Sequence, residues 1–222
     1  MTAVGLLGGT FDPFHMGHLD LARAARRAMG FDRVILIPSH VPPHRGVPHA
    51  SAPHRFAMVA LAIQDEPGLE VSDVELEDDG PSYTSRTLDR LAARGFDTRS
   101  ACFIVGADAF RDIRSWKDYP AILDRCHFIV VSRPGWPAPA MRRELPALAD
   151  RMIDAPCPPR SRPGIFLVEA ATADVSSTEV RRRAAGGESL EGLVPASVIA
   201  HIGRHALYRV PDARAEVEQG AS

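Results

Sequence analysis

Residues 8–18 read GGTFDPFHMGH and directly follow a short apolar run, AVGLL. The two glycines allow a ligand to approach the backbone closely, and Asp12-Pro13 is typical of a turn. If a helix begins near His15 and His18, its free N–H groups and the positive end of its dipole favour a bound phosphate. The two imidazoles then lie on one side of the first turn and can donate hydrogen bonds to that anion, which favours their charged forms. The alternative is a glycine turn in which both imidazoles merely cap and pack the helix.

Residues 174–183, DVSSTEVRRR, form a second candidate phosphate element near the other end of the chain. One of the hydroxyl residues 176–178 can cap a helix, and Arg181 then projects from its first turn. Residues 182–183 point in other directions and are expected to be solvated. A simple helix cap is the alternative. Residues 8–18 are not followed by GK[ST] and lack G-x-G-x-x-G, which excludes a Walker A loop and the dinucleotide fingerprint there.

Apolar strands and amphipathic helices alternate along the chain and must position these two elements. The patterns predict strands over residues 3–7, 33–38, 70–76, 101–106, 127–133 and 164–170. They predict helices over residues 18–29, 53–64, 84–94, 107–113, 120–125, 177–185 and 195–206. Continuous apolar strands separated by helices indicate an α/β fold, a doubly wound Rossmann-like parallel sheet with helices on both faces. Ligands of such sheets bind beyond the carboxyl ends of the strands.

The composition is that of a globular protein with one domain. The chain has 222 residues, 45% of them hydrophobic, and a net charge of −2. That charge argues against a general nucleic-acid or membrane-surface partner, and no apolar run is long enough for a spanning helix. Three cysteines at positions 102, 126 and 157 without CxxC spacing indicate a reducing, cytoplasmic setting. We expect one domain over residues 1–209, with its C-terminal helical part at about 177–208 and a disordered tail over 210–222.

GGTFDPFHMGH resembles the signature of the HxGH nucleotidyltransferases, which join a nucleotide to a phosphate-bearing acceptor. SSTEVR, residues 176–181, resembles their second element, which faces the ATP phosphates. The resemblance implies that His15, His18 and Arg181 are catalytic. It implies ATP contacts from Gly8, Gly9, Thr10, Phe11, His15, His18, Gly106, Asp108, Ser177, Thr178 and Arg181. It further implies Mg²⁺ as cofactor, held by phosphates and water rather than by protein side chains.

Three other stretches are similar to those of bacterial nicotinate-mononucleotide adenylyltransferases. They are IPSHVPPHRG (37–46), with arginine at a position where lysine is common, GPSYTSRTLDRL (80–91) and FIVGADAFRDIRSWKDY (103–119). This resemblance implies mononucleotide contacts from Asp12, His40, His44, Arg45, Tyr83, Thr84, Asp108, Trp116 and Arg133. Trp116 would stack on the pyridine ring, and backbone N–H groups near Tyr83 and Thr84 would meet its carboxylate.

Other interpretations of the same stretches stay open. In one interpretation the histidines at positions 40, 44, 49 and 54 form a zinc site. In another they belong to a solvated proline-rich loop. Tyr83 and Trp116 can be packing residues. The resemblance implies that ATP and nicotinate mononucleotide give deamido-NAD and pyrophosphate. One alternative is another phosphorylated acceptor, such as phosphopantetheine or nicotinamide mononucleotide. A second is a nucleotide-binding module without turnover. The protein could also form a homo-oligomer.

Overall fold

The computed structural model describes residues 4–42, 46–76, 80–98, 101–156 and 162–209. Its centre is a sheet of seven strands in the order β3-β2-β1-β4-β5-β7-β6, and every neighbouring pair is parallel. The strands are β1 Val4–Gly9, β2 Val34–Pro38, β3 Leu69–Val71, β4 Ala101–Gly106, β5 His127–Val131, β6 Met152–Asp154 and β7 Ile165–Val168. The predicted doubly wound sheet is confirmed. Because the chain winds outward from β1 to β3 and then returns to β4, the β1–β4 boundary is the switch point at which such sheets bind ligands.

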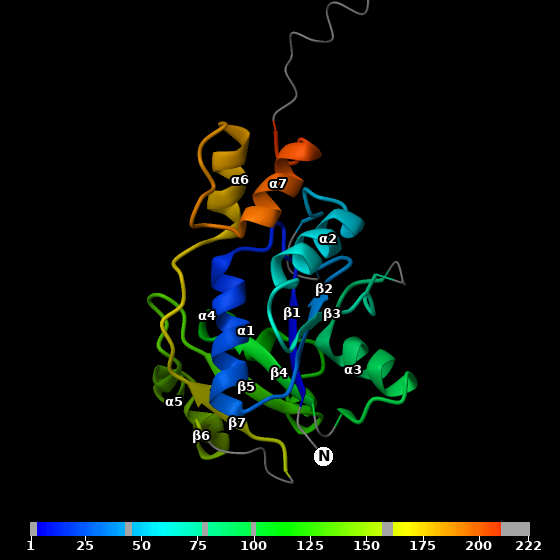
Figure 1. Ribbon diagram of the computed structural model, residues 1–222. Coiled ribbons are helices and arrows are strands. Elements are labelled where there is room, and N and C mark those ends of the chain that lie inside the picture. Colours follow the sequence, from blue (N-terminus) through cyan, green and yellow to red (C-terminus); the bar gives the residue numbers. More distant parts are fainter. Residues whose placement is uncertain (1–3, 43–45, 77–79, 99–100, 157–161, 210–222) are drawn as a thin grey trace, which may run out of the picture.

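The α-helices lie on both faces of the sheet and at its carboxyl end (Figure 1). They are α1 Met16–Met29, α2 Ala52–Ile63, α3 Thr84–Ala93, α4 Ala107–Phe110, α5 Met141–Glu144, α6 Ser177–Ala185 and α7 Ala196–Arg204. Figure 1 shows α6 and α7 at the same end of the molecule as the start of α1. The C-terminal helices are therefore placed where they can contact the loop after β1.

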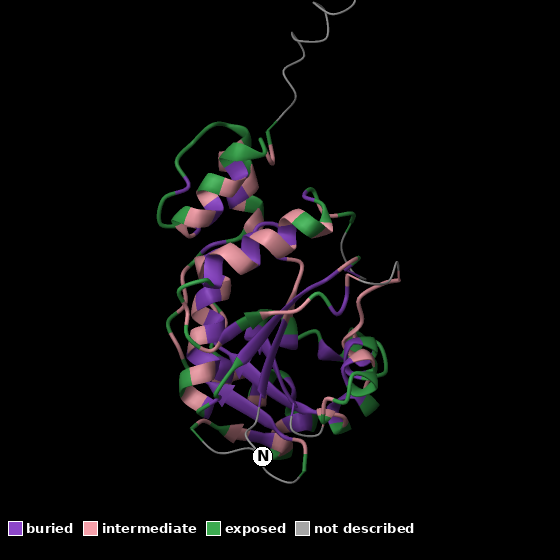
Figure 2. Ribbon diagram, turned by 45° about the vertical axis from the view of Figure 1, so that its right-hand side comes forward, coloured by how far each residue is buried: buried purple, intermediate pink, exposed green. Residues whose placement is uncertain are grey.

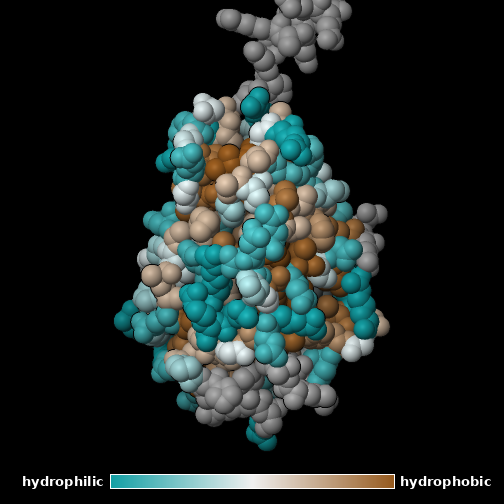
Figure 3. All heavy atoms as spheres, viewed as in Figure 1, coloured by the Kyte–Doolittle hydropathy of each residue, from teal (hydrophilic) through white to brown (hydrophobic). Residues whose placement is uncertain are grey.

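Alternating side chains of the strands supply two cores. Leu7 belongs to the core under α1 and α2, whereas its neighbour Leu6 belongs to the core under α3 and α4. The strands are buried throughout the centre of the molecule, and exposed residues gather on the helices (Figure 2). In the space-filling view, hydrophobic residues form separate patches between hydrophilic ones (Figure 3). None of the helices among the described residues is long and apolar enough to cross a bilayer.

The structure corrects several element boundaries. The strand predicted over 70–76 is only Leu69–Val71, because the chain turns after it, with the Leu76 N–H donating to the Asp73 carbonyl. The helix predicted over 120–125 is a 3₁₀ turn, Ala121–Asp124. The sequence patterns missed β6, a three-residue edge strand that is too short to show a period.

Two of the three cysteines belong to the described structure. Cys102 and Cys126 are fully buried, and burial raises the pKa of each thiol to about 12. The expected tail over 210–222 and Cys157 lie outside the described residues.

Candidate active site

A cleft of about 820 Å³ opens at the carboxyl ends of β1 and β4. It is lined by residues from the loop after β1, the start of α3, the loop after β4 and the first turn of α6. Of the residues predicted for the site, those lining it are Gly8, Gly9, Thr10, Phe11, Asp12, His15, His18, Tyr83, Thr84, Gly106, Asp108, Trp116, Arg133, Ser177, Thr178 and Arg181. The fold thus brings together two elements more than 150 positions apart in the sequence.

His15 and His18 stand side by side at the beginning of α1. His15 is the N-cap residue, and the two rings stack with centroids 3.6 Å apart. The His15 backbone N–H donates to Nδ1 of His18 over 3.3 Å. Because that nitrogen accepts, a neutral His18 carries its proton on Nε2. The pair therefore presents a fixed tautomer of His18 to the cleft.

The surroundings of His15 set its protonation in the absence of a ligand. Burial, with the positive charge of Arg133 as a second cause, lowers the pKa of His15 to about 3. The imidazole is thus neutral at physiological pH in the protein without a ligand. A neutral imidazole still has one N–H to donate, so His15 can bind an anion by a hydrogen bond without carrying charge itself.

Gly9 and Gly17 leave room for the side chains of Phe11 and Arg133. A Cβ on Gly9 would lie 2.6 Å from Cε1 of Phe11, a buried ring on a residue with a φ of 50°. A Cβ on Gly17 would lie 2.6 Å from a terminal nitrogen of Arg133. That guanidinium donates to the Gly17 carbonyl over 3.3 Å and to the Val175 carbonyl over 3.4 Å. The glycine of HMGH thus admits Arg133 to the first turn of α1.

The first turn of α6 is fastened to the loop after β1. Arg181 donates to the Asp12 carbonyl over 2.7 Å, and the Ser177 hydroxyl donates to the Pro13 carbonyl over 3.1 Å. Ser176 caps the helix by accepting from the Glu179 N–H. Arg182 is exposed and pairs with Glu179 and Glu188, as expected of a solvated side chain. Of the three consecutive arginines 181–183, Arg181 alone lines the cleft.

Asp12 joins three separate parts of the chain. Its carboxylate accepts from the backbone N–H groups of His49 at 2.7 Å and Ala50 at 3.0 Å, and from the Tyr208 hydroxyl at 2.8 Å. Asp12 is 4% exposed, so these bonds are shielded from water. The Asp12 carboxylate therefore orders the backbone at residues 49–50 and holds Tyr208.

Arg55 is a structural residue that the sequence patterns missed. It is 1% exposed and donates to the carbonyls of Thr10, Ser39, His40 and Ala50. The four bonds tie the loop after β1 to the loop after β2. A signal was present in the sequence, because an arginine among the apolar residues of a helix must find polar partners when it is buried.

The start of α3 forms the opposite wall of the cleft. Tyr83 is the N-cap of α3 and Thr84 its first residue, so the unpaired N–H groups of a ten-residue helix begin here. Lys117, which the sequence analysis did not single out, lies 4.7 Å above the Tyr83 ring. Burial raises the pKa of Glu75, another lining residue that was missed. The helix N-terminus and the ammonium group make this wall suitable for a carboxylate.

Trp116 has both a packing contact and a place on the cleft. Its ring meets Phe103 and Phe128 edge-on, with centroids 6.0 Å and 6.2 Å away. Asp108 follows β4 at the rim, and a Cβ on Gly106 would lie 2.4 Å from its Oδ1. The packing interpretation of Trp116 therefore does not exclude a ligand contact, since the same ring lines the cleft.

The loop after β2 contributes to the cleft through residues on either side of His44 and Arg45, namely Pro42 and residues 46–49. His40 is absent from the lining residues, and its backbone N–H donates to the Ser82 hydroxyl. His44 and Arg45 lie outside the described residues. The zinc site considered for this loop stays a prediction, because His44 lies outside the described residues; the ring of His54 faces His201 and His205.

A parallel sheet whose switch point opens into a cleft lined by the N-termini of α1, α3 and α6, two imidazoles and arginines defines a nucleotide-binding α/β protein. Comparisons with known proteins make this more specific. The model of the cytidylyltransferase-like family matches residues 6–183. Curated relatives named probable nicotinate-nucleotide adenylyltransferase include one from Roseiflexus sp., 41% identical over 93% of this chain and 98% of its own. Another, from Symbiobacterium thermophilum, is 42% identical over 94% and 96%. The chain belongs to the cytidylyltransferase-like family and, within it, to the nicotinate-nucleotide adenylyltransferases.

Solved structures confirm the fold. The Plasmodium falciparum nicotinic acid mononucleotide adenylyltransferase complexed with NaAD has a TM-score of 0.70 at 16% identity, covering 94% of this chain and 98% of that one. A putative nicotinate-nucleotide adenylyltransferase from Vibrio parahaemolyticus has a TM-score of 0.59 at 17% identity, with 94% and 96% covered. At these identities the likeness concerns the arrangement of the elements.

Proposed function

We propose that this protein transfers the adenylyl group of ATP to nicotinate mononucleotide, which gives deamido-NAD and pyrophosphate. The observation that carries the proposal is the single cleft that joins the histidine pair and α6 on one side to the start of α3 on the other. The first side suits a polyphosphate and the second a carboxylate-bearing acceptor. The names of the relatives, at 41% and 42% identity over nearly the whole chain, support the same reaction.

We assign the triphosphate to the side formed by the first loop and α6. His15, His18 and Arg181 would act on the reacting phosphates, with Ser177, Thr178 and the α6 N-terminus beside them. Gly8 to Phe11, Gly106 and Asp108 would hold the rest of ATP. The mononucleotide would contact Tyr83, Thr84, Asp108, Trp116 and Arg133. His44 and Arg45 remain candidates for its phosphate.

The reaction supplies its own nucleophile. A phosphate monoester with a second pKa near ~6 is largely ionised at neutral pH, so the acceptor oxygen attacks the α-phosphorus without a general base. The protein then contributes alignment and neutralisation of charge. His18 would donate from Nε2, and His15 would donate as a neutral imidazole. Arg181 adds a fixed positive charge.

The metal would be Mg²⁺ bound to the triphosphate and to water. The Asp12 carboxylate already accepts hydrogen bonds from three donors of the protein, so it is not available as a metal ligand. This fits an ion that is held by phosphates and water. When bound with ATP, the ion supplies positive charge to the triphosphate. We also propose a cytoplasmic location, which the cysteine spacing of the sequence predicts.

The proposal is tested with His18→Ala. Losing one donor to the transition state reduces turnover by at least ~100-fold, while circular dichroism and the melting temperature stay close to those of the wild type. Arg182→Ala is the matched control, since its ion pairs lie on the exposed side of α6. Unchanged turnover in His18→Ala would contradict the assignment.

A panel of acceptors decides the substrate. ATP is incubated with nicotinate mononucleotide, nicotinamide mononucleotide or phosphopantetheine, and pyrophosphate is measured. We expect nicotinate mononucleotide to be used best, because the α3 N-terminus and Lys117 favour a carboxylate over an amide. Faster reaction with phosphopantetheine would replace the proposal, and no pyrophosphate with any acceptor would indicate a binding module.

A further inference from the structure

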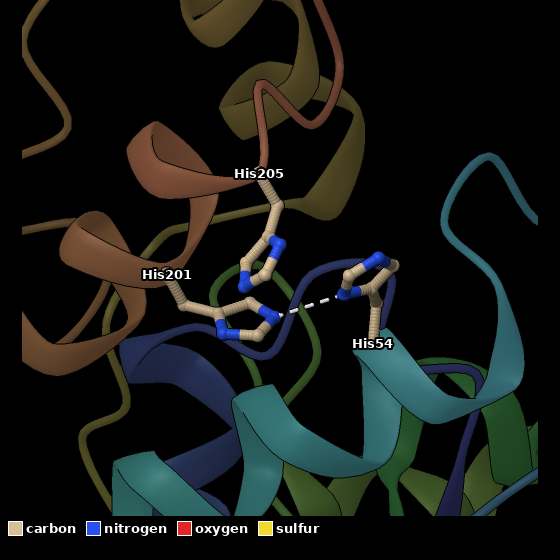
Figure 4. A group of neighbouring side chains, drawn as sticks. All are labelled: His54, His201 and His205. Atoms are coloured by element: carbon tan, nitrogen blue, oxygen red, sulfur yellow. Dashed lines mark hydrogen bonds between the residues drawn. The ribbon is translucent and has the colours of Figure 1, made fainter.

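Three histidines converge where α7 packs on α2, outside the set of residues that line the cleft. His54 comes from the first turn of α2, His201 lies in α7, and His205 is the C-cap residue of α7, four positions later (Figure 4). Nδ1 of His54 lies 3.1 Å from Nε2 of His201, and one ring nitrogen from each residue lies within 4.8 Å of the others. We propose that these histidines bind a divalent transition-metal ion, with Zn²⁺ as the ion that fits.

The distances are close to those of a tetrahedral site. Zn–N bonds of about 2.0–2.1 Å place two ligand nitrogens roughly 3.3–3.4 Å apart in a tetrahedron. The His54–His201 separation of 3.1 Å already approaches this value. The His205 ring nitrogen lies within 4.8 Å of the other two nitrogens, so it has to move inward by at most about 1.5 Å to reach the tetrahedral distance. Its ring can do so, since His205 is exposed at the end of α7.

The donor set selects the type of ion. Imidazole suits zinc, nickel and copper, whereas magnesium and calcium require oxygen ligands. In the part of the chain that the structure describes, no carboxylate or thiol belongs to this group. Three imidazoles leave one position of a tetrahedral ion for water.

The surroundings of His201 disfavour its charged form. Burial lowers the pKa of His201, and the neighbouring His205, His54 and Arg204 act in the same direction. A neutral imidazole keeps a lone pair for a metal. The hydrogen bond between His54 and His201 explains why these two rings approach each other. It does not explain the position of the His205 ring, whose centroid lies 4.5 Å from that of His201 and 4.8 Å from that of His54.

A metal here would fasten α7 to α2 behind the cleft. Besides the histidines, the two helices are joined by the Ser197 hydroxyl, which donates to the Leu61 carbonyl, and by the buried Val198 and Ile202. α7 leads directly to Tyr208 and its bond to Asp12. The ion would therefore stabilise the C-terminal part of the protein, and the inference does not depend on the proposed reaction.

The test is a titration of the chelator-treated, full-length protein with Zn²⁺ and, separately, with Co²⁺. We expect one equivalent to bind, with the visible absorption of four-coordinate Co²⁺. A hundredfold excess of Zn²⁺ over its Kd raises the melting temperature by about 5 °C or more. The absence of a saturable equivalent, or a Co²⁺ spectrum without four-coordinate bands, would overturn the site.

Variants locate the ion. His205→Ala and His201→Ala should each weaken Zn²⁺ binding at least tenfold and remove the Co²⁺ absorption, whereas His49→Ala, an exposed imidazole outside the cluster, should bind as the wild type does. If His201→Ala is unstable without metal, the exposed His205 decides the result. Binding that survives His205→Ala unchanged would assign the ion to other histidines and refute the proposal.

Discussion

Tyr208→Phe removes the hydroxyl that connects the C-terminal part of the described chain to the loop after β1. That hydroxyl donates to Oδ1 of Asp12 at 2.8 Å, and the carboxylate is 4% exposed. Phenylalanine keeps the ring, which packs against the core under α1 and α2. The variant therefore tests the hydrogen bond separately from the packing.

The expected cost follows from the partners that remain. A hydrogen bond to a charged group contributes about 1.5–3 kcal/mol. Asp12 keeps two backbone donors, His49 and Ala50, so the lower half of that range, about 1.5–2 kcal/mol, applies. For a protein of this size each kcal/mol corresponds to roughly 2–4 °C, so the melting temperature should fall by about 3–8 °C at pH 7.

The pH dependence gives a sharper test of the same bond. Burial raises the pKa of Tyr208, and the negative charge of Asp12 raises it further. The folded-state pKa thus lies above the unfolded value of about 10, so the stabilisation is complete below pH ~10 and is lost as the pH rises beyond it. Urea unfolding of both proteins should show a constant difference between pH 7 and 9 that shrinks above pH ~10. A melting temperature that falls by less than 1 °C, or a difference that stays constant at alkaline pH, would refute the reasoning.

Two further changes probe the walls of the cleft. Trp116→Ala should raise the KM for the mononucleotide more than the KM for ATP, because the ring lies on the acceptor side of the cleft in the proposed arrangement. Steady-state kinetics with each substrate varied test this, and an effect confined to ATP would contradict it. Gly9→Ala places a Cβ 2.6 Å from the buried Phe11 ring and should destabilise the protein by about 1–3 kcal/mol in urea unfolding. Gly203→Ala, a helical position with open space, is the control and should not destabilise.

The sequence predicted the sheet and the meeting of its two phosphate elements for one physical reason. Parallel strands place all of their following loops at one edge, so motifs after different strands come together whatever their separation. The loop after β1, Gly106 and Asp108 after β4, and Arg133 after β5 line one cleft for this reason. The helical start at Thr84 was also correct, because helix periodicity is readable over ten residues.

What the sequence could not show depends on single long-range bonds. Arg55 meets four carbonyls that lie 5 to 45 positions away. No periodic pattern contains that information. The protonation of His15 without a ligand could not be predicted for a related cause, since burial decides it and burial depends on the whole fold. The histidine cluster escaped for the same reason, because His54 is nearly 150 positions from His201.

The rigidity of the first loop comes from the far end of the chain. The Met16 N–H donates to the Leu193 carbonyl, Arg181 holds the Asp12 carbonyl, and Tyr208 holds the Asp12 side chain. A donor that stabilises a transition state acts through a fixed position, so in the proposed reaction these three bonds contribute to the placement of His15 and His18. It follows that changes in α7 and after it should reduce turnover through the geometry of the first loop, and that Tyr208→Phe should lower turnover as well as stability.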